Sequence, residues 1–288
     1  MTVPPWPERG GLREACDAAF ERKVAFAEQA EKDFALARLL WGYGEEFGEQ
    51  LLLKGGTCLS KVDLGFHRIS EDADFVLPMP NSDDDLAVPK LFAGIIPRLS
   101  DAAGKAGFEM ERGAGIQANG GKLRSWRLSY ASIYGPGGKG NIWLEVSVHD
   151  VCLAVRRAQL TSVIEGESVK DFGQAFCYAL HADEVRAEKV RAAFTRDEIR
   201  DFFDLSIFAT VGHDMKSEQF AALVDRKLAE FPAAPLSEQP PNFGKDEMRL
   251  RRLAGSIPAR LMPQLPPDSQ QFALEPVLAE YNKMWNKA

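Results

Sequence analysis

Apolar residues in the first quarter of the chain recur at helical spacing and then form a short run. Residues 13–47 carry apolar side chains three and four positions apart with few helix breakers, which predicts one long helix. The leucines at 51–53 run into a glycine pair, which predicts a short buried strand followed by a tight turn. A second helix should continue to about Leu64, with Gly65 as its stop.

Alternating patterns then predict three further strands. Residues 72–77 form an apolar strand with acids at its start, and 89–106 form a helix that begins with a proline. Residues 122–134 and 141–149 alternate around a turn rich in glycine and proline, which predicts an antiparallel hairpin. After about residue 155 the composition shifts and the pattern becomes helical.

These elements predict an α+β fold. Residues 1–155 should form a core with an N-terminal helix and a mixed or antiparallel sheet flanked by helices, and 156–288 a mostly helical second domain. Hydrophobic residues make up 45% of the 288 and charged residues 27%, which is ordinary for a globular protein and excludes a disordered or fibrous class.

The cysteines are scattered without a Cys-x-x-Cys pair, so neither a disulfide framework nor a zinc site is expected. No apolar run reaches the length of a membrane span, and the N-terminus does not resemble a signal peptide, so we expect a cytoplasmic protein without membrane association. The net charge of −7 argues against a protein that coats nucleic acid through bulk positive charge. Local basic patches remain compatible with it.

Two acids open the strand at 72–77. Asp72 and Asp74 alternate with apolar neighbours, so their side chains share one face about 6.6 Å apart along the strand. Carboxylates held this close repel one another unless a cation neutralises them, and hard oxygen ligands suit Mg²⁺. Asp-x-Asp alone is a common spacing, which recurs here at 83–85. Its position after a glycine turn, at the start of an apolar strand, favours a metal site.

The turn before that strand has the sequence Lys54-Gly55-Gly56-Thr57. Glycines allow backbone amides to approach an anion closely, and the start of the following helix favours a phosphate. Thr57 could cap that helix or donate to a phosphate oxygen. The alternative is a strand-to-helix turn that needs glycine only for its backbone angles.

A third acid lies in the middle of the strand at 141–149. Glu145 shares a face with Trp143 and Ser147, opposite a face of aliphatic residues. It either faces solvent or belongs to a site. If this strand pairs near 72–77, the three carboxylates could hold two metal ions.

This ordered set of motifs resembles the DNA polymerase beta-like nucleotidyltransferases. More narrowly, LLLKGGTCLSK followed by HRISEDADFVL resembles the AbiEii/AbiGii group, toxins of type IV toxin–antitoxin and abortive-infection systems. A further match is the E-K-hydrophobic-x-A segment at 188–192 with R-D-x-x-D-L at 200–205. The resemblance covers about residues 35–210.

The resemblance implies roles for the downstream residues. It makes Lys189 a contact to the nucleotide triphosphate, while Asp201 and Asp204 position Lys189 and Arg200 or contact the sugar or base. Arg68 is a further phosphate contact. From spacing alone, these charges would be a solvated helix face with local ion pairs. Thr195 and Glu198 have capping-box spacing, which predicts that a helix starts there.

The implied activity is transfer of a nucleoside monophosphate from an NTP to an acceptor hydroxyl. Asp72, Asp74 and Glu145 would bind two Mg²⁺ or Mn²⁺ ions, and the helical domain would complete the active site. The family implies an RNA acceptor, with tRNA 3′ ends as the precedent, and a cognate antitoxin partner. Two alternatives stay open, namely modification of a protein or small molecule, and a catalytically silent partner-binding module.

Basic residues concentrate in the helical half, where they could form a track for an RNA backbone. Solvated helix faces are the equally good alternative. The residues are Arg186, Lys189, Arg191, Arg196, Arg200, Lys245, Arg249, Arg251, Arg252 and Arg260.

Overall fold

The computed structural model describes residues 3–79, 87–210, 217–230 and 247–267. The chain divides into two compact units. Unit 1 comprises Met1–His181 with Pro266–Asp268, and unit 2 begins at Ala182 and includes residues to Leu265. The sequence predicts a boundary at 155/156, whereas residues 156–181 contribute strands to unit 1.

The helices and strands below are those of the described residues. The α-helices are α1 (Arg9–Glu21), α2 (Ala27–Phe47), α3 (Gly55–Cys58), α4 (Ala87–Lys105), α5 (Ala182–Thr195), α6 (Ile199–Thr210), α7 (Glu218–Ala229) and α8 (Glu247–Ser256). The strands are β1 (Leu52–Leu53), β2 (Asp72–Pro78), β3 (Glu109–Met110), β4 (Ile116–Ala118), β5 (Leu123–Ala131), β6 (Lys139–His149), β7 (Arg156–Gln159) and β8 (Phe176–Ala179). Shorter 3₁₀ and π turns connect them, including a π turn at Leu59–Asp63 that extends α3.

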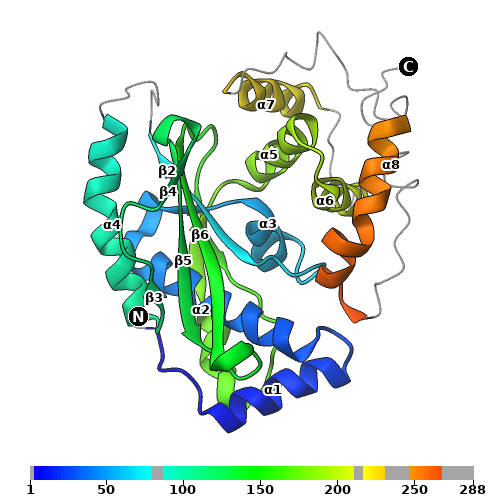
Figure 1. The fold of residues 1–288 in the computed structure, drawn as a ribbon. Helices are drawn as coiled ribbons and strands as arrows, with labels where there is room; N and C mark the ends of the chain where they lie inside the picture. The colour runs from blue at the N-terminus through cyan, green and yellow to red at the C-terminus, as the bar shows by residue number, and fades with distance from the viewer. Residues whose placement is uncertain (1–2, 80–86, 211–216, 231–246, 268–288) are drawn as a thin grey trace. The chain divides into compact units, whose positions relative to one another are not determined.

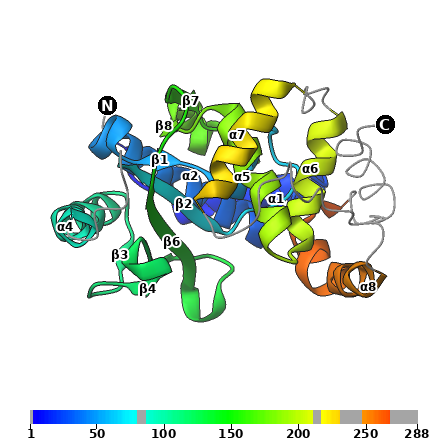
Figure 2. The ribbon, with the colours of Figure 1, turned by 90° about the horizontal axis from the view of Figure 1, so that it is seen from above.

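Eight strands within the described residues form one mixed sheet in unit 1 (Figures 1 and 2). The strand order is β3-β5-β6-β2-β1-β8-β7, with β4 paired to the outside of β5. β2 runs parallel to β6 and β1 parallel to β8, while the other pairs are antiparallel. The predicted α+β fold and the β5–β6 hairpin are confirmed.

One face of the central strands forms the core of unit 1. Alternation places Ala73, Phe75 and Leu77 on this face, and all three are buried. α2 and α4 cover it. Tyr43 of α2 packs against Phe75 of β2 with ring centroids 5.5 Å apart, and Phe92 of α4 packs against Trp126 of β5 with ring centroids 6.4 Å apart. The acids of β2 therefore point to the opposite face, which frees that face for chemistry.

The sequence predicts one helix over residues 13–47, whereas the structure has two helices in this region. α1 ends at Glu21 and α2 begins at Ala27, and Lys23 between them has a φ of 57°. A left-handed residue ends a helix. Neither glycine nor proline marks this turn in the sequence, so the helical spacing on both sides hides it. The two helices pack against each other.

The sequence also missed the short strands β3, β4, β7 and β8. Each has only two to four residues, too few for alternation to distinguish a strand from a loop. β8 is mostly buried beside β1, with Leu53 paired to Ala179. Its place in the sheet depends on this long-range pairing.

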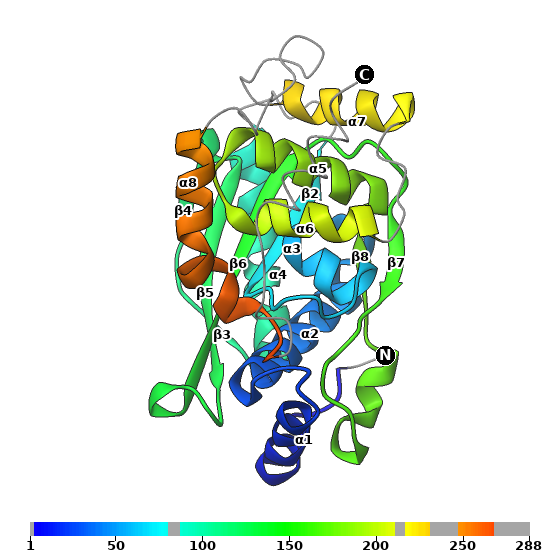
Figure 3. The same cartoon turned by 90° about the vertical axis from the view of Figure 1, so that its right-hand side faces the viewer.

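Unit 2 is built from helices, as the sequence predicts. α5 contacts both α6 and α7, and α6 also contacts α8 (Figure 3). Lys227 of α7 is fully buried and lies 2.6 Å from Glu184 of α5. Burial alone would lower the pKa of Lys227, but Glu188, Glu230 and Glu184 together raise it. Its charge is thus retained inside the helix bundle.

No helix among the described residues is long and apolar enough to cross a membrane.

Candidate active site

The register of β2 against β6 brings the three predicted acids together. Asp74 is the direct partner of Glu145, and Asp72 is the partner of Trp143. Paired residues in a ladder point to the same face, and neighbouring strands lie roughly 4.8 Å apart. Asp72, Asp74 and Glu145 are all partly exposed on the face opposite the core. The pairing on which the three-carboxylate cluster depended is therefore present.

The glycine turn lies directly against this cluster. The backbone N–H of Lys54 donates to the carbonyl of Asp74 at 2.9 Å, which joins the turn to β2. Gly55 has a φ of 69°, and a Cβ there would collide with the Asp74 carboxylate. A Cβ on Gly56 would likewise collide with the Arg68 guanidinium. Glycine is thus needed at Gly55 both for its conformation and for the space that Asp74 occupies.

Thr57 fixes the turn to the strand. It is fully buried, and its hydroxyl donates to the backbone carbonyl of Asp72 and lies 2.7 Å from the Ser70 hydroxyl. It makes no helix-capping hydrogen bond, which the sequence had offered as one of its roles. Thr57 and Ser70 therefore define where Asp72 lies relative to the turn. Ser70 belongs to the HRISEDADFVL segment that carries the family resemblance.

Arg68 and Lys54 place positive charge beside the turn. Arg68 is buried, and its Nη1 donates to the carbonyl of Ile69 at 3.0 Å while Nη2 faces Gly56. Lys54 is partly exposed, and no ion pair is found for it among the described residues. The structure thus brings the predicted phosphate contacts Lys54, Gly55, Gly56 and Arg68 next to the acids.

The donors fit a divalent cation. Carboxylate oxygens are the hard ligands that Mg²⁺ and Mn²⁺ prefer. The lack of a side chain at Gly55 leaves room for the Asp74 carboxylate that any larger residue would displace. The three acids and the glycine turn therefore have the donor chemistry that a metal-bound anion requires.

In unit 2, Lys189 is held by both predicted aspartates. Its Nζ lies 2.9 Å from an oxygen of Asp201 and 2.9 Å from one of Asp204, and all three side chains are buried. Burial alone would raise the pKa of Asp201, but the charges and hydrogen bonds of Lys189 and Arg196 outweigh it and hold the pKa below its usual value. Both aspartates that the resemblance assigns to Lys189 thus form ion pairs with it.

Arg200 is placed differently from the prediction. Asp201 accepts from Arg196 at 2.7 Å rather than from Arg200, which instead lies 3.9 Å from Glu198. The predicted capping box is also wrong, because Thr195 ends α5 and donates to the carbonyl of Arg191. Positive and negative residues alternate closely over residues 196–201, so the sequence alone does not show which of them form ion pairs.

Most of the basic residues singled out in the helical half lie next to acids of unit 2. The ion pairs include Arg186–Asp183, Arg191–Glu188, Arg196–Asp201, Arg252–Asp197 and Arg260–Glu198. Lys245 and the side chain of Arg249 lie outside the described residues. These ion pairs argue against a continuous basic track for RNA in unit 2, because neighbouring carboxylates neutralise the positive charges.

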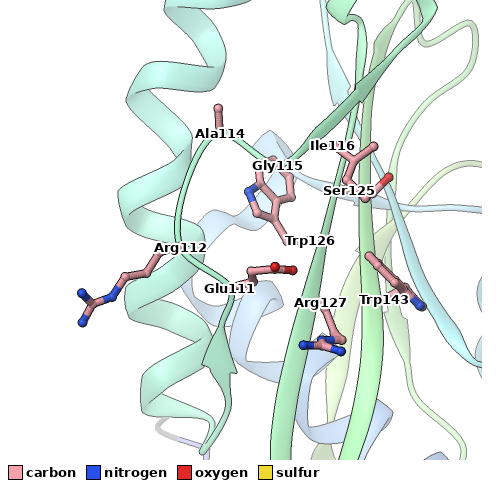
Figure 4. Close-up of a pocket in the computed structure, with 9 residues that line it drawn as sticks. All are labelled: Glu111, Arg112, Ala114, Gly115, Ile116, Ser125, Trp126, Arg127 and Trp143. Atoms are coloured by element: carbon pink, nitrogen blue, oxygen red, sulfur yellow. The ribbon is translucent and has the colours of Figure 1, made fainter.

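Unit 1 also has a hollow that the sequence did not indicate. Its volume is about 400 Å³, and it is formed by the β3–β4 connection with β5 and β6 (Figure 4). Trp143 and Ser125, both of which line it, are direct strand partners of Asp72 and Glu145. The alternation that placed Trp143 on the face of Glu145 was the one signal for it in the sequence.

Two solved structures share the fold of this chain. MenT4, a nucleotidyltransferase toxin from Mycobacterium tuberculosis H37Rv, matches with a TM-score of 0.61 and 22% identity, over 96% of this chain and 88% of that one. JHP933 from Helicobacter pylori matches with a TM-score of 0.53 and 17% identity, over 89% of this chain and 90% of that one. The fold is that of a nucleotidyltransferase.

Residues 38–276 match the model of a family described as "Nucleotidyl transferase AbiEii toxin, Type IV TA system", and the chain belongs to this family. No curated protein matches the sequence. Membership makes the chain an NTP-dependent nucleotidyltransferase, which sets aside the alternative of a catalytically silent module. It also makes the chain the toxin of a toxin–antitoxin pair, with an antitoxin as its partner.

Proposed function

We propose that this toxin transfers a nucleoside monophosphate from an NTP to the terminal 3′ hydroxyl of an RNA, with the 3′ end of tRNA as the first candidate. The acceptor oxygen forms a bond to the α-phosphorus, the bond from that phosphorus to the β-phosphate oxygen breaks, and pyrophosphate leaves. The proposal is carried by the pairing of Asp74 with Glu145 in the β2–β6 ladder. Acting on tRNA, the enzyme would work in the cytoplasm.

Asp72, Asp74 and Glu145 are the residues proposed to hold divalent metal. Bound Mg²⁺ or Mn²⁺ would supply neutralisation of the charge that develops on the phosphate oxygens and the attacking oxygen. Glu145 lies at the acceptor side of the cluster, beside Ser125 of β5, and is positioned to accept the proton of the acceptor hydroxyl. Asp72 and Asp74 fix the reacting groups through their place on one rigid strand.

The glycine turn is the proposed site of the β- and γ-phosphates. Gly55 and Gly56 leave their backbone close to an approaching anion, and Lys54 and Arg68 supply positive charge beside it. Thr57 acts as a positioning residue in this arrangement, since its hydroxyl is engaged with β2. The β- and γ-phosphates bound at the turn would leave together as pyrophosphate after the transfer.

For unit 2 we propose that Lys189 contacts an NTP phosphate and that Asp201 and Asp204 orient it. An ammonium group has three N–H donors, and the two aspartates account for two of them. Arg200 is partly exposed next to this cluster on α6 and is proposed as a further nucleotide contact. The family resemblance supplies these roles, and the ion pairs supply the fixed orientation.

An RNA acceptor competes with a protein or small-molecule acceptor. Arg127, exposed on β5, lies across from Trp143 on the face of the acids, and no ion pair is found for it among the described residues. A cation there suits a phosphate backbone better than a neutral acceptor. This placement favours a nucleic acid.

The proposal is tested by incubating the purified toxin and total RNA with each α-labelled NTP in turn. Labelled tRNA-sized RNA is expected from the wild type. Loss of one cluster acid, as in Asp72→Asn or Asp74→Asn, should lower transfer by at least about 100-fold because the chemistry depends on positioning and charge neutralisation. Asp101→Asn, an exposed aspartate of α4, is the matched control and should keep wild-type activity.

Two results would contradict the proposal. Label that appears only in a protein or a small molecule would replace the RNA acceptor. Full transfer by Asp72→Asn would remove the carboxylate cluster from the mechanism.

A further inference from the structure

Side chains of three neighbouring strands form a regular grid that includes the acids of the site. On the solvent side of the sheet, one row across the strands consists of Arg127 of β5, Trp143 of β6 and Asp72 of β2. The next row consists of Ser125, Glu145 and Asp74. Adjacent members of a row lie about 5 Å apart between strands. Trp143 is thus placed between an arginine and a carboxylate of the cluster.

The exposure of Trp143 is unusual for its position. It lies on β6, which is paired on both sides, yet 43% of it is exposed. Ile116 of β4, at 64% exposed, lines the same hollow. These are two of the four large apolar residues that are exposed within the described part of the chain. An apolar surface of this kind, next to reacting groups, indicates a ligand.

The charged side chains around the hollow indicate which kind of ligand it would bind. Arg127 is exposed, and among the described residues neither an ion pair nor a hydrogen bond of its side chain is found. Glu111 also lines the hollow, while Arg112 at its rim points away from Trp143 (Figure 4). An indole face with a neighbouring guanidinium suits a nucleotide, whose base stacks and whose phosphate pairs with the arginine.

We infer that Trp143 and Arg127 form the binding site for the last nucleotides of a single-stranded RNA acceptor. The inference rests on the proposed function and adds the residues that hold the acceptor. A base stacks on Trp143 and a backbone phosphate pairs with Arg127. The terminal ribose hydroxyl then falls toward Asp72 and Glu145, the neighbours of Trp143 in the grid. Because every base has a stacking face, this contact orients the acceptor end with little sequence preference.

The test measures the Michaelis constants for a single-stranded 12-nucleotide RNA and for the NTP in separate titrations. Loss of a base–aromatic stack costs about 1–3 kcal/mol, so Trp143→Ala should raise the KM for RNA about 5- to 150-fold. The KM for the NTP should change by less than about twofold, because the nucleotide contacts are elsewhere. Trp143→Phe keeps an aromatic face and should stay within about threefold of the wild type.

Two further variants separate the contributions. Arg127→Ala should weaken RNA binding and reduce the slope of log K against log salt by about 0.7, the value for one phosphate contact on a single strand. Phe20→Ala removes an aromatic side chain of similar exposure (49%) from α1, outside the grid, and should bind RNA like the wild type. Trp143 is exposed, so its variants should fold with unchanged melting temperature.

The outcomes separate failure of the inference from failure of the proposed function. If the wild type labels RNA and Trp143→Ala does so with the same KM for RNA, the acceptor site is overturned while the proposed function stands. If Trp143→Ala keeps its RNA kinetics but is no longer neutralised by its antitoxin, the surface is a protein interface and the inference is overturned. If the wild type labels no RNA with any NTP, both proposals fall.

Discussion

Replacement of Gly55 by alanine should displace the Asp74 carboxylate and lower the activity far more than it lowers the stability of the fold. Gly55 has a φ of 69°, and an ideal Cβ there would lie 3.1 Å from both Cβ and Cγ of Asp74, closer than ordinary van der Waals contact, and nearer still to Oδ2. The backbone cannot retreat easily, because Lys54 is hydrogen-bonded to the Asp74 carbonyl. The Asp74 carboxylate must therefore turn away.

Two costs follow, and they differ in size. A left-handed alanine costs about 1–2 kcal/mol, which should lower the melting temperature by roughly 2–8 °C in a domain of this size. Displacement of a catalytic group by about 1 Å can lower a rate about 100-fold. Gly55→Ala should therefore lose at least about 100-fold of its transfer activity while remaining folded at room temperature.

Gly65→Ala is the matched control for this change. Gly65 has the same φ of 69°, but a Cβ there would meet no atom within 4 Å. Both variants should lose similar stability by thermal denaturation, and only Gly55→Ala should lose transfer of label from an α-labelled NTP. Equal activity of the two variants would refute the steric role of Gly55, and it would also weaken the place of Asp74 in the site.

Three further predictions follow from the ion pairs and the acids. Lys227→Met leaves Glu184 buried without its cation, so the free energy of unfolding should fall by about 3–5 kcal/mol, as measured by urea denaturation. The pKa of Asp201 is lower in the folded state than its ordinary value of 3.8, so the stabilisation that its charge provides is present above that value and lost as pH falls through the folded pKa. The urea midpoint of the wild type should fall as the pH drops below about 4, and this fall should be smaller in Asp201→Asn. A fall of equal size in both proteins would contradict the lowered pKa of Asp201. Removal of divalent ions with EDTA should lower transfer at least about 100-fold and added Mg²⁺ or Mn²⁺ should restore it, whereas full activity in EDTA would exclude metal dependence.

The acid cluster could be predicted from the sequence because strand alternation and the glycine turn are local signals. Asp72 and Asp74 share a face by spacing alone, and Glu145 lies in the middle of an alternating strand. The register that sets Glu145 beside Asp74 is a long-range property, so the sequence could state it only as a condition. Local patterns thus predict the parts of the proposed site, and the sheet register determines how they are arranged.

The features that the sequence missed depend on partners far along the chain. The break at Lys23 carries no glycine or proline, and β8 is recognisable only beside β1. Arg196 and Arg200 lie four residues apart on a charged segment, and only the packing of α5 on α6 determines which of them reaches Asp201. Helix propensity does not distinguish between two arginines of the same segment, so it cannot predict which of them pairs with Asp201.

The distribution of charge bears on how an acidic chain could act on the RNA acceptor proposed above. The net charge is −7, and many cations of unit 2 are paired with adjacent acids, as Lys189 is with Asp201 and Asp204. Bulk attraction is therefore a poor source of RNA affinity. Stacking on Trp143 and a single phosphate contact at Arg127 need little net charge, and they should give binding with a shallow salt dependence. The proposed site would select an RNA end over duplex RNA, because only an end offers an unstacked base beside a free hydroxyl.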